Sequence, residues 1–403
     1  MNLNKNNIYV QQVNDVLLGS DEVVCLPSKN ELLELLEKKK NLRVKLGIDP
    51  TNPDLHLGHT VCLQALRKFQ DYGHTPVLII GGFTATVGDP SGRNEARPPL
   101  SYEQVEKNSK TYLDQVSKIL DLDKVEVVNN YEWFSKFSLN QVLELAHIVT
   151  VNQLIGKEAF GKRIEESKPL YLHEVLYPIL QGYDSVLVKA DIELGGVDQT
   201  FNVLFGRHVQ KHFKQKEQLA IFYPLLIGLD GAKKMSKSFN NYIALNDTPD
   251  QIFGKAMSIP DELMVHYYKL ATPLSIQKIQ NYQAELNAGR NPRDIKFELA
   301  YQLVMQLYDV HLAEVAKENF IKQFQKNEIP DEISEYKLNE PLKVIDLMCF
   351  AKLVSSKSEA KRLIEGGGVK LKSKRVDDPN LLITSNDKNS VLQIGKRKFV
   401  KIV

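Results

Sequence analysis

The first 230 residues alternate short apolar runs with helical patterns, and this alternation restricts the possible folds more than any other feature of the chain. The apolar runs that predict strands lie at 43–48, 76–82, 124–128, 185–189 and 219–229. Helical periodicity predicts helices around them, at 31–40, 58–72, 101–120, 172–181 and 198–213. Strands that are joined through helices pair in parallel, so the pattern predicts an α/β fold with a doubly wound parallel sheet.

The pattern changes after residue 246. Thr248 is a predicted helix cap, with Pro249 in the first turn and Gln251 three residues after the cap. Helical periodicity then continues to about residue 324, and the segment after it is rich in Glu, Pro and Asp. We therefore predict four parts, which are an α/β domain at 1–246, a helical domain at 247–325, a linker at 326–340 and a small α+β domain at 341–403.

Positive charge is concentrated at the C-terminal end of the chain. The whole sequence has a net charge of +2, whereas residues 341–403 hold 14 Lys or Arg against 6 Asp or Glu. A basic domain on a mildly acidic body is typical of a module that contacts a polyanion, usually nucleic acid. A solvated basic surface without a partner is the alternative.

Several classes of protein are disfavoured by what the sequence lacks. Cys25, Cys62 and Cys349 are far apart and form no CxxC pair, so neither a zinc site nor a disulfide scaffold is expected. No window approaches the ~18 apolar residues of a membrane span, and the first ten residues lack the apolar core of a signal peptide. We therefore expect a cytoplasmic protein without a membrane segment and without a protein-bound metal.

The first motif that carries chemistry is His56-Leu57-Gly58-His59, at the predicted start of a helix. Two imidazoles beside the free backbone N–H groups of a helix N-terminus can hold the phosphates of a nucleotide. We expect Gly58 to allow close approach of the ligand, since a side chain there would block it.

The second motif is Lys234-Met235-Ser236-Lys237-Ser238, which follows a turn at 230–232. Two lysines in a mobile loop can close over a triphosphate and neutralise the charge that develops as pyrophosphate leaves. An ordinary exposed loop is the alternative for this segment taken alone. The sequence contains no GxxxxGK[ST] motif, which excludes a P-loop as the source of ATP binding.

Two further segments offer groups for a polar ligand. The loop 88–97 follows a predicted buried strand, where Asp89 can pair with an ammonium group and Arg93 and Arg97 can reach phosphate or RNA. A simple turn held by an Asp-to-backbone bond is the alternative there. Tyr177, Gln181 and Asp184 lie at i, i+4 and i+7, so a helix would place them on one face as a polar stripe.

The C-terminal segment 355–371 has a predicted basic helix, a glycine turn at 366–368 and then a strand. It resembles an S4-type RNA-binding domain. Basic side chains on such a surface contact phosphates, which positions RNA more than it selects a sequence.

Together, the two motifs resemble the HIGH and KMSKS signatures of class I aminoacyl-tRNA synthetases, and the polar stripe resembles the tyrosine pocket of the tyrosyl-tRNA synthetases. The resemblance to this family extends over nearly the whole chain from about residue 42. It implies a Rossmann-like catalytic domain, a helical anticodon-side domain and an S4-like domain. It further implies that the enzyme forms tyrosyl-adenylate from L-tyrosine and ATP, with Mg²⁺ carried by ATP, and transfers tyrosine to tRNA(Tyr). A homodimer is also implied, and we place its interface near residues 149–160.

The resemblance implies a role for each site residue, in four sets. The expected catalytic residues are Thr51, His56, His59, Lys234 and Lys237. The expected ATP site comprises Gly47, Asp49, His56, Gly58, His59, Gly196, Asp198, Lys234 and Lys237. The expected tyrosine site comprises Thr84, Asp89, Tyr177, Gln181, Asp184 and Gln199, with the phenol donating to Asp184. The expected tRNA contacts are Arg93, Arg97, Lys357, Lys361, Arg362 and Lys370.

One position departs from the pattern of many bacterial members. They have a second Tyr near the end of the first strand, where this chain has Lys45. A second bacterial branch of the family shares this feature. Phenol recognition then depends more heavily on Asp184, and the partner of Lys45 is left open.

Three rival interpretations remain. A tryptophanyl-tRNA synthetase lacks both the polar stripe and the S4-like domain. A small-molecule nucleotidyltransferase with an HxGH motif has no need of the helical and S4-like regions. A non-catalytic RNA-binding relative leaves the histidines and lysines of the two motifs without a role.

Overall fold

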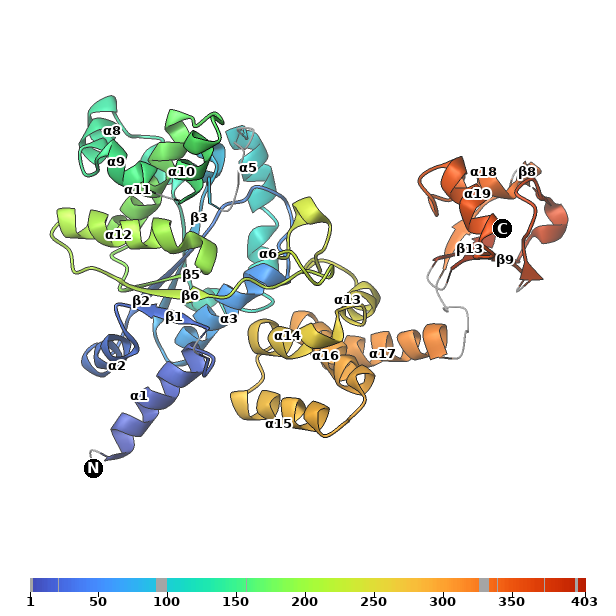
Figure 1. The fold of residues 1–403 in the computed structure, drawn as a ribbon, viewed down its shortest axis with the longest axis horizontal. Helices are drawn as coiled ribbons and strands as arrows, with labels where there is room; N and C mark the ends of the chain where they lie inside the picture. The colour runs from blue at the N-terminus through green and yellow to red at the C-terminus, as the bar shows by residue number, and fades with distance from the viewer. Residues whose placement is uncertain are drawn as a thin grey trace. The chain divides into compact units, whose positions relative to one another are not determined.

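The computed structural model describes residues 3–20, 22–91, 100–156, 158–325, 333–338, 340–372, 374–395 and 398–403. The chain divides into two compact units, Met1–Ala313 and Glu314–Val403 (Figure 1). The first unit contains a large α/β sheet with its helices and a helical region, and the second contains a small basic α+β fold. No helix in the described part of the chain is both long enough and apolar enough to cross a membrane.

The central sheet of the first unit has the strand order β1-β6-β5-β2-β3-β4. Its strands are β1 (Val24–Leu26), β2 (Arg43–Ile48), β3 (Thr75–Ile80), β4 (Glu126–Asn129), β5 (Ile192–Gly196) and β6 (Leu219–Tyr223). All neighbours pair in parallel except the edge strand β1, which runs antiparallel to β6. The predicted doubly wound parallel sheet is confirmed. The strand order reverses between β2 and β5, and ligands bind at the carboxyl ends of the strands at such a point.

One predicted strand was wrong. The run 185–189 is the last turn and the end of a helix, α11 (Leu172–Leu187), and the strand of this region is β5. Over only five residues, the periodicity of a buried strand cannot be told from that of a buried helical turn, because the apolar positions fit both. The sequence of β5 concealed the strand, since it contains the charged Glu193 and ends in Gly195 and Gly196.

The helices cover both faces of the sheet. Helix α3 (Leu57–Asp71) lies against β2, β3 and β5, and α12 (Thr200–His212) lies against β5 and β6 while packing on α11 (Figure 1). Each helix directs an apolar stripe at the sheet, as its period of 3.6 residues requires. The other helices of the α/β part are α1 (Leu3–Val16), α2 (Lys29–Lys38), α4 (Thr84–Val87), α5 (Tyr102–Ser109), α6 (Tyr112–Val116), α7 (Tyr131–Phe134), α8 (Leu139–Ala146), α9 (Val151–Ile155) and α10 (Glu158–Glu165).

The boundaries differ from the predictions in two further places. The predicted helix 101–120 is interrupted between α5 and α6, and a capping box of Ser101 and Gln104 marks the start of α5. The predicted strand 219–229 ends at Tyr223, and the segment that follows leads toward the lysine motif. The N-terminal elements α1 and β1 were not predicted, because their apolar positions are few.

The helical region of the first unit begins as predicted, with Thr248 capping a helix through Gln251. Its helices are α13 (Pro249–Ala256), α14 (Met264–Ala271), α15 (Ile276–Asn287), α16 (Pro292–Leu307) and α17 (Val310–Gln325), which continues into the second unit. Helix α14 packs on α3, so this region and the α/β part form one compact unit. The division at residue 246 stays a prediction.

The second unit has a five-stranded sheet in the order β10-β9-β12-β13-β7 and a two-stranded sheet of β11 and β8. The strands are β7 (Ser334–Tyr336), β8 (Leu342–Lys343), β9 (Val369–Leu371), β10 (Lys374–Arg375), β11 (Leu382–Ile383), β12 (Val391–Ile394) and β13 (Lys398–Ile402). Two helices, α18 (Val344–Phe350) and α19 (Lys357–Glu365), share a buried apolar cluster with these strands.

Candidate active site

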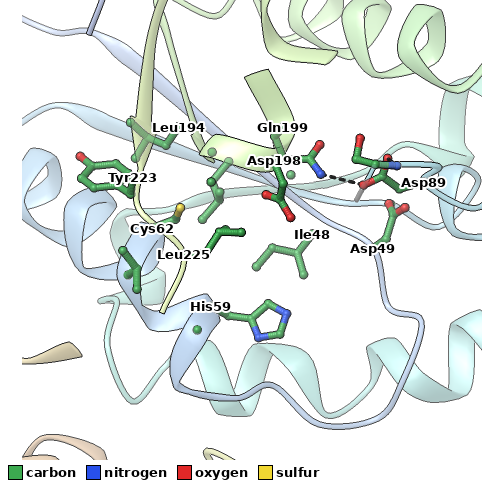
Figure 2. Close-up of a pocket in the computed structure, with 18 of the residues that line it drawn as sticks. Ile48, Asp49, His59, Cys62, Asp89, Leu194, Asp198, Gln199, Tyr223 and Leu225 are labelled. Carbon is green, nitrogen blue, oxygen red and sulfur yellow. Dashed lines mark hydrogen bonds between the residues drawn. The ribbon is translucent and has the colours of Figure 1, made fainter. Parts of the chain in front are cut away.

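A cavity of about 800 Å³ opens at the carboxyl ends of β2 and β5, where the strand order reverses. Its walls come from β2, the start of α3, the loop after β3, helix α11, the end of β5 and the lysine motif. Figure 2 shows Asp198 and Gln199 from the end of β5 on one side of this cavity and His59 of α3 across from them. The volume and the mixed lining fit a ligand that has both polar and apolar parts.

The two histidines of the first motif are fixed by the backbone at the start of α3. Nδ1 of His56 accepts a hydrogen bond from the backbone N–H of Gly58 at 3.1 Å, and Nδ1 of His59 accepts one from the backbone N–H of His56 at 3.1 Å. A neutral imidazole that accepts at Nδ1 carries its proton at Nε2. His56 therefore presents Nε2 as a donor, whereas Nδ1 of His59 also lies 3.2 Å from the carbonyl oxygen of His56 and can donate to it in the other tautomer.

Burial keeps both histidines neutral. It lowers the pKa of His56 to about 2 and that of His59 to about 4, and the nearby Lys237 adds to both shifts. Neutral donors at a helix N-terminus suit an anionic ligand, because they stabilise negative charge without changing protonation near pH 7.

The structure adds a second reason for Gly58, and the predicted close approach of a ligand stays a prediction. A Cβ atom at this position would lie 2.9 Å from two ring atoms of His56, so a side chain would displace the histidine itself. Gly47 of β2, by contrast, lines the cavity with open space where its Cβ would be. The place of Gly47 in the ATP site stays a prediction.

The lysine motif is held across the mouth of the cavity. Lys234 Nζ lies 2.9 Å from Oδ2 of Asp198, and Lys237 Nζ donates to the backbone carbonyl of Asp54 at 2.6 Å. The backbone N–H of Ser236 donates to Asn241 at 2.8 Å. These contacts place both ammonium groups beside the histidines, although the two motifs are far apart in the sequence.

Carboxylates dominate the inner part of the cavity. Asp49 accepts hydrogen bonds from the hydroxyl of Tyr177 at 2.9 Å and from the hydroxyl of Thr84 at 2.7 Å. Asp89 accepts one from Nε2 of Gln199 at 2.7 Å, as Figure 2 shows. Several carboxylates that face one space create a negative potential, which suits the ammonium group of an amino acid.

Asp184 ends the polar stripe of α11 and is almost fully buried. Asn130 Nδ2 donates to its Oδ2 and Trp133 Nε1 donates to its Oδ1, each at 3.1 Å. Burial raises the pKa of this carboxyl to about 7, against the opposing effects of Lys45 and of the two donors. Asp184 is therefore poised to gain from one more donor, which a phenol hydroxyl would supply.

Asn130 and Trp133 were not predicted as site residues. A signal was available, because Asn130 directly follows β4 and a polar residue after a parallel strand lies at the edge where ligands bind. Trp133 is the single tryptophan of the sequence, but nothing in the local pattern connects it with Asp184.

The structure answers the question about Lys45. Its ammonium group forms a buried ion pair with Glu193 at 2.9 Å and not with Asp184. It also donates to the hydroxyl of Ser185 at 2.6 Å and to the backbone carbonyl of Gln181 at 3.0 Å.

Most of the predicted site residues come together in this cavity. Those that line it are Gly47, Asp49, Thr51, His56, Gly58, His59, Thr84, Asp89, Tyr177, Gln181, Asp184, Gly196, Asp198, Gln199 and Lys234. Lys237 lies beside it through its bond to the carbonyl of Asp54. Arg93 and Arg97 lie outside the described residues. The other predicted RNA contacts, which are exposed on α19 and β9 of the second unit, are Lys357, Lys361, Arg362 and Lys370.

Among the described residues, no group of three or more His, Cys, Asp or Glu side chains is arranged to hold a metal ion.

Comparisons with known proteins agree with this arrangement. Residues 37–325 match the family "tRNA synthetases class I (W and Y)", and residues 344–389 match the S4 domain. The tyrosine–tRNA ligase of Francisella tularensis subsp. tularensis is 47% identical over 385 residues, which cover 96% of each chain. The tyrosine–tRNA ligase of Thermotoga maritima is 46% identical over 381 residues, which cover 94% of this chain and 95% of the relative.

Solved structures show the same fold at low sequence identity. The tyrosyl-tRNA synthetase of Archaeoglobus fulgidus complexed with L-tyrosine has a TM-score of 0.62 and 21% identity, and the match covers 77% of this chain and 99% of the other. The tryptophanyl-tRNA synthetase of Plasmodium falciparum has a TM-score of 0.58 and 15% identity, covering 77% and 89%. The fold is thus common to both specificities, whereas both sequence relatives named above are tyrosine–tRNA ligases. The chain belongs to the W and Y family of class I tRNA synthetases, and within it to the tyrosine–tRNA ligases.

Proposed function

We propose that this chain activates L-tyrosine with ATP and transfers the tyrosyl group to tRNA(Tyr). The single observation that carries the choice of amino acid is the buried carboxyl of Asp184, which takes two fixed donors and faces the cavity. A phenol hydroxyl completes its hydrogen bonding, whereas phenylalanine would leave a buried acceptor partly unsatisfied. Enzymes of this kind reject the analogue that lacks the hydroxyl for that reason.

In the proposed first step, the tyrosine carboxylate attacks the α-phosphorus of ATP, and the bond to pyrophosphate breaks. The protein supplies no covalent nucleophile and acts by positioning and by stabilising charge. His56, with Thr51, would donate to the departing phosphates, and Lys234 and Lys237 would neutralise them. Mg²⁺ would enter as part of the substrate, since its ligands in such sites are mostly phosphate oxygens and water.

The remaining residues of the cavity divide between the two substrates. We assign the amino group of tyrosine to Asp89, Tyr177 and Gln181, with Thr84 supporting them through Asp49 and with Gln199 near the carboxylate. Residues assigned to the adenosine part are Gly47, Asp49, Gly58, His59, Gly196 and Asp198. The carboxylate of Asp89 and the lysines of the loop support this division, because the ammonium group of tyrosine and the phosphates of ATP would each meet the opposite charge.

The tRNA would contact both units of the chain. The exposed basic residues of α19 and β9 support phosphate contacts by the S4 domain. Arg93 and Arg97 are proposed as contacts with phosphate or tRNA from the sequence alone. Since the proposed substrates are ATP and tRNA, we place the reaction in the cytoplasm.

A homodimer is part of the proposal. Of the segment 149–160 that the sequence suggested, Val151 is 64% exposed, whereas Phe160 is fully buried. Exposed apolar side chains also lie on α8 and at the start of α11, with Leu139 at 73% and Leu172 at 77%. Figure 1 shows α8, α9 and α11 in the same part of the α/β region. Apolar side chains that gather on one surface are typical of a protein interface. Sedimentation of the wild type and of Leu172→Glu tests the proposed homodimer. A dimer in the wild type that is weakened in the variant is expected, and a monomer in both would reject the homodimer.

A direct test of the overall function is aminoacylation. The purified protein is expected to charge tRNA(Tyr) with tyrosine and not tRNA(Trp) with tryptophan. Charging with tryptophan would keep the enzyme class and overturn the assignment of substrate. Binding of tRNA without charging of any amino acid would favour the non-catalytic relative.

A further inference from the structure

We propose that the buried ion pair between Lys45 and Glu193 determines the specificity of the amino-acid pocket, with Lys45 favouring the anionic, accepting form of Asp184 and Glu193 orienting Gln181. This inference rests on the proposed function, because it assigns the phenol of the substrate to Asp184 and its ammonium group to Gln181. Lys45 and Glu193 act as positioning residues, since they would work through these two side chains.

The pair occupies a particular place in the fold. Lys45 of β2 and Glu193 of β5 are directly opposite each other in the parallel register, at the point where the strand order reverses. Their side chains are 1% and 2% exposed, and both line the floor of the cavity. Two parallel strands therefore place one cation and one anion beneath the ligand.

All three ammonium hydrogens of Lys45 have partners, and two of these partners belong to α11. They are Glu193 Oε1 at 2.9 Å, Ser185 Oγ at 2.6 Å and the backbone carbonyl of Gln181 at 3.0 Å. The hydroxyl of Ser185 donates onward to Glu193 Oε2 at 3.0 Å, and Gln218 Nε2 also donates to that oxygen. The pair thus holds the turn of α11 that runs from Gln181 to Asp184.

Glu193 also sets the orientation of the Gln181 amide. Nε2 of Gln181 donates to Oε1 of Glu193 at 3.2 Å, on the same oxygen that pairs with Lys45. An amide whose nitrogen is engaged in this way retains its oxygen as the acceptor. An accepting oxygen is what an ammonium group requires, so Glu193 prepares Gln181 for the amino end of the substrate.

The charges explain why the pair is more than a structural element. A buried ion pair is often no more stabilising than apolar side chains of similar size, so stability alone is a weak reason for it. Lys45, Glu193 and Asp184 together carry one net negative charge, and removal of either partner changes the charge that Asp184 experiences. Four elements supply the groups that act on Asp184. They are Lys45 of β2, Glu193 of β5, Tyr177 of α11, and Asn130 and Trp133 at the start of α7 and within it.

The two partners have opposite effects on the proton of Asp184. Burial raises the pKa of this carboxyl to about 7, Lys45 lowers it, and Glu193 raises it. Without Lys45 the proton is held more strongly, so the acceptor form appears only at higher pH. Without Glu193 the proton is held less strongly, so the acceptor form persists to lower pH.

The experiment measures kcat/KM for tyrosine in ATP–pyrophosphate exchange as a function of pH, in wild type, Lys45→Met and Glu193→Gln. We expect the midpoint of the profile to move upward by about one unit or more in Lys45→Met and downward in Glu193→Gln. The midpoint of Lys45→Arg should stay close to that of wild type, because this substitution preserves the positive charge. Lys68→Met is the matched control, since Lys68 is also largely buried and bonded to a backbone carbonyl, that of Asp15, and its midpoint should not move.

Folding is separated from function by the double variant Lys45→Met/Glu193→Gln. It removes both charges together, so it should be more stable than Lys45→Met, while its tyrosine-to-phenylalanine ratio stays below that of wild type. Midpoints that coincide with wild type in both single variants would overturn the inference and leave the proposed function intact. Absence of tyrosine-dependent exchange in the wild-type protein would overturn both.

Discussion

The indole N–H of Trp133 donates a hydrogen bond of 3.1 Å to Oδ1 of Asp184, so the single tryptophan of the chain contacts the acidic group that we assign to the phenol. With Asn130 on the other oxygen, the carboxyl is held in one orientation. Tryptophan fluorescence therefore reports directly on this part of the pocket.

Replacement of Trp133 by Phe should weaken tyrosine binding. It removes one hydrogen bond to a buried charged acceptor, which contributes about 1.5 kcal/mol, so the KM for tyrosine should rise about tenfold. Steady-state exchange kinetics measure the KM for tyrosine, and the KM for ATP should change little. Tyr131→Phe, on the same short helix, is the control. An unchanged KM for tyrosine in Trp133→Phe would show that this bond does not support the acceptor.

The pH dependence of the wild-type enzyme should follow Asp184. Its pKa is raised to about 7, so the accepting carboxylate predominates above that value and is lost as the pH falls. We expect kcat/KM for tyrosine to rise about tenfold between pH 6 and pH 8, since this quantity reports the free enzyme. The histidines should not contribute, because their pKa values lie at about 2 and 4. A flat profile over this range would argue against Asp184 as the acceptor.

His56 has two separable roles, as helix cap and as phosphate donor. His56→Ala removes both, and His56→Asn keeps a capping side chain but not the donor at the position of Nε2. Both variants should lower kcat for exchange by about 10²-fold, whereas only His56→Ala should lose ~1 kcal/mol of unfolding free energy. Exchange kinetics and urea denaturation give the two values. Wild-type kcat in His56→Asn would restrict the residue to a capping role.

The two lysines of the loop should act on catalysis and not on tyrosine binding. Lys234→Ala and Lys237→Ala are each expected to lower kcat by at least about 10²-fold, because they remove charge from the departing pyrophosphate. Tyrosine affinity, followed by Trp133 fluorescence, should remain within about twofold of wild type. Lys233→Ala is the matched control, since Lys233 lies over the ring of Phe239 in the same loop. Equal losses in all three variants would point to a general effect on the loop.

The basic helix of the S4 domain should affect tRNA alone. Lys361→Ala/Arg362→Ala should raise the KM for tRNA and reduce the slope of log affinity against log salt by about 1.4, since two phosphate contacts are lost. Pyrophosphate exchange should be unchanged. Lys38→Ala, an exposed lysine on α2, is the control. An unaltered salt slope would exclude these two residues from the contact with tRNA.

The sheet and the two sequence motifs could be predicted from local signals, whereas the roles of most other cavity residues followed from the resemblance to the tyrosyl-tRNA synthetases. Parallel strands have continuous apolar runs, and residues that follow them lie at one edge of the sheet, which is where the sequence places the loop of Asp89. The polar stripe of α11 was predicted in the same way, from the helical period alone.

The contacts that depend on tertiary structure could not be predicted. The strand β5 was not predicted, because it contains the charged Glu193. A charged residue is tolerated in a buried strand only with a partner, and its partner, Lys45, is distant in the sequence. For the same reason the donors to Asp184 were missed, because Asn130 and Trp133 come from a different strand connection.

The central claim is tested most directly by ATP–pyrophosphate exchange with each of the twenty amino acids, repeated with Asp184→Ala. Exchange with tyrosine alone in the wild-type protein, and its loss in the variant, is the predicted result. Exchange with another amino acid, or with tyrosine equally well in Asp184→Ala, would contradict the assignment of the phenol to this carboxyl.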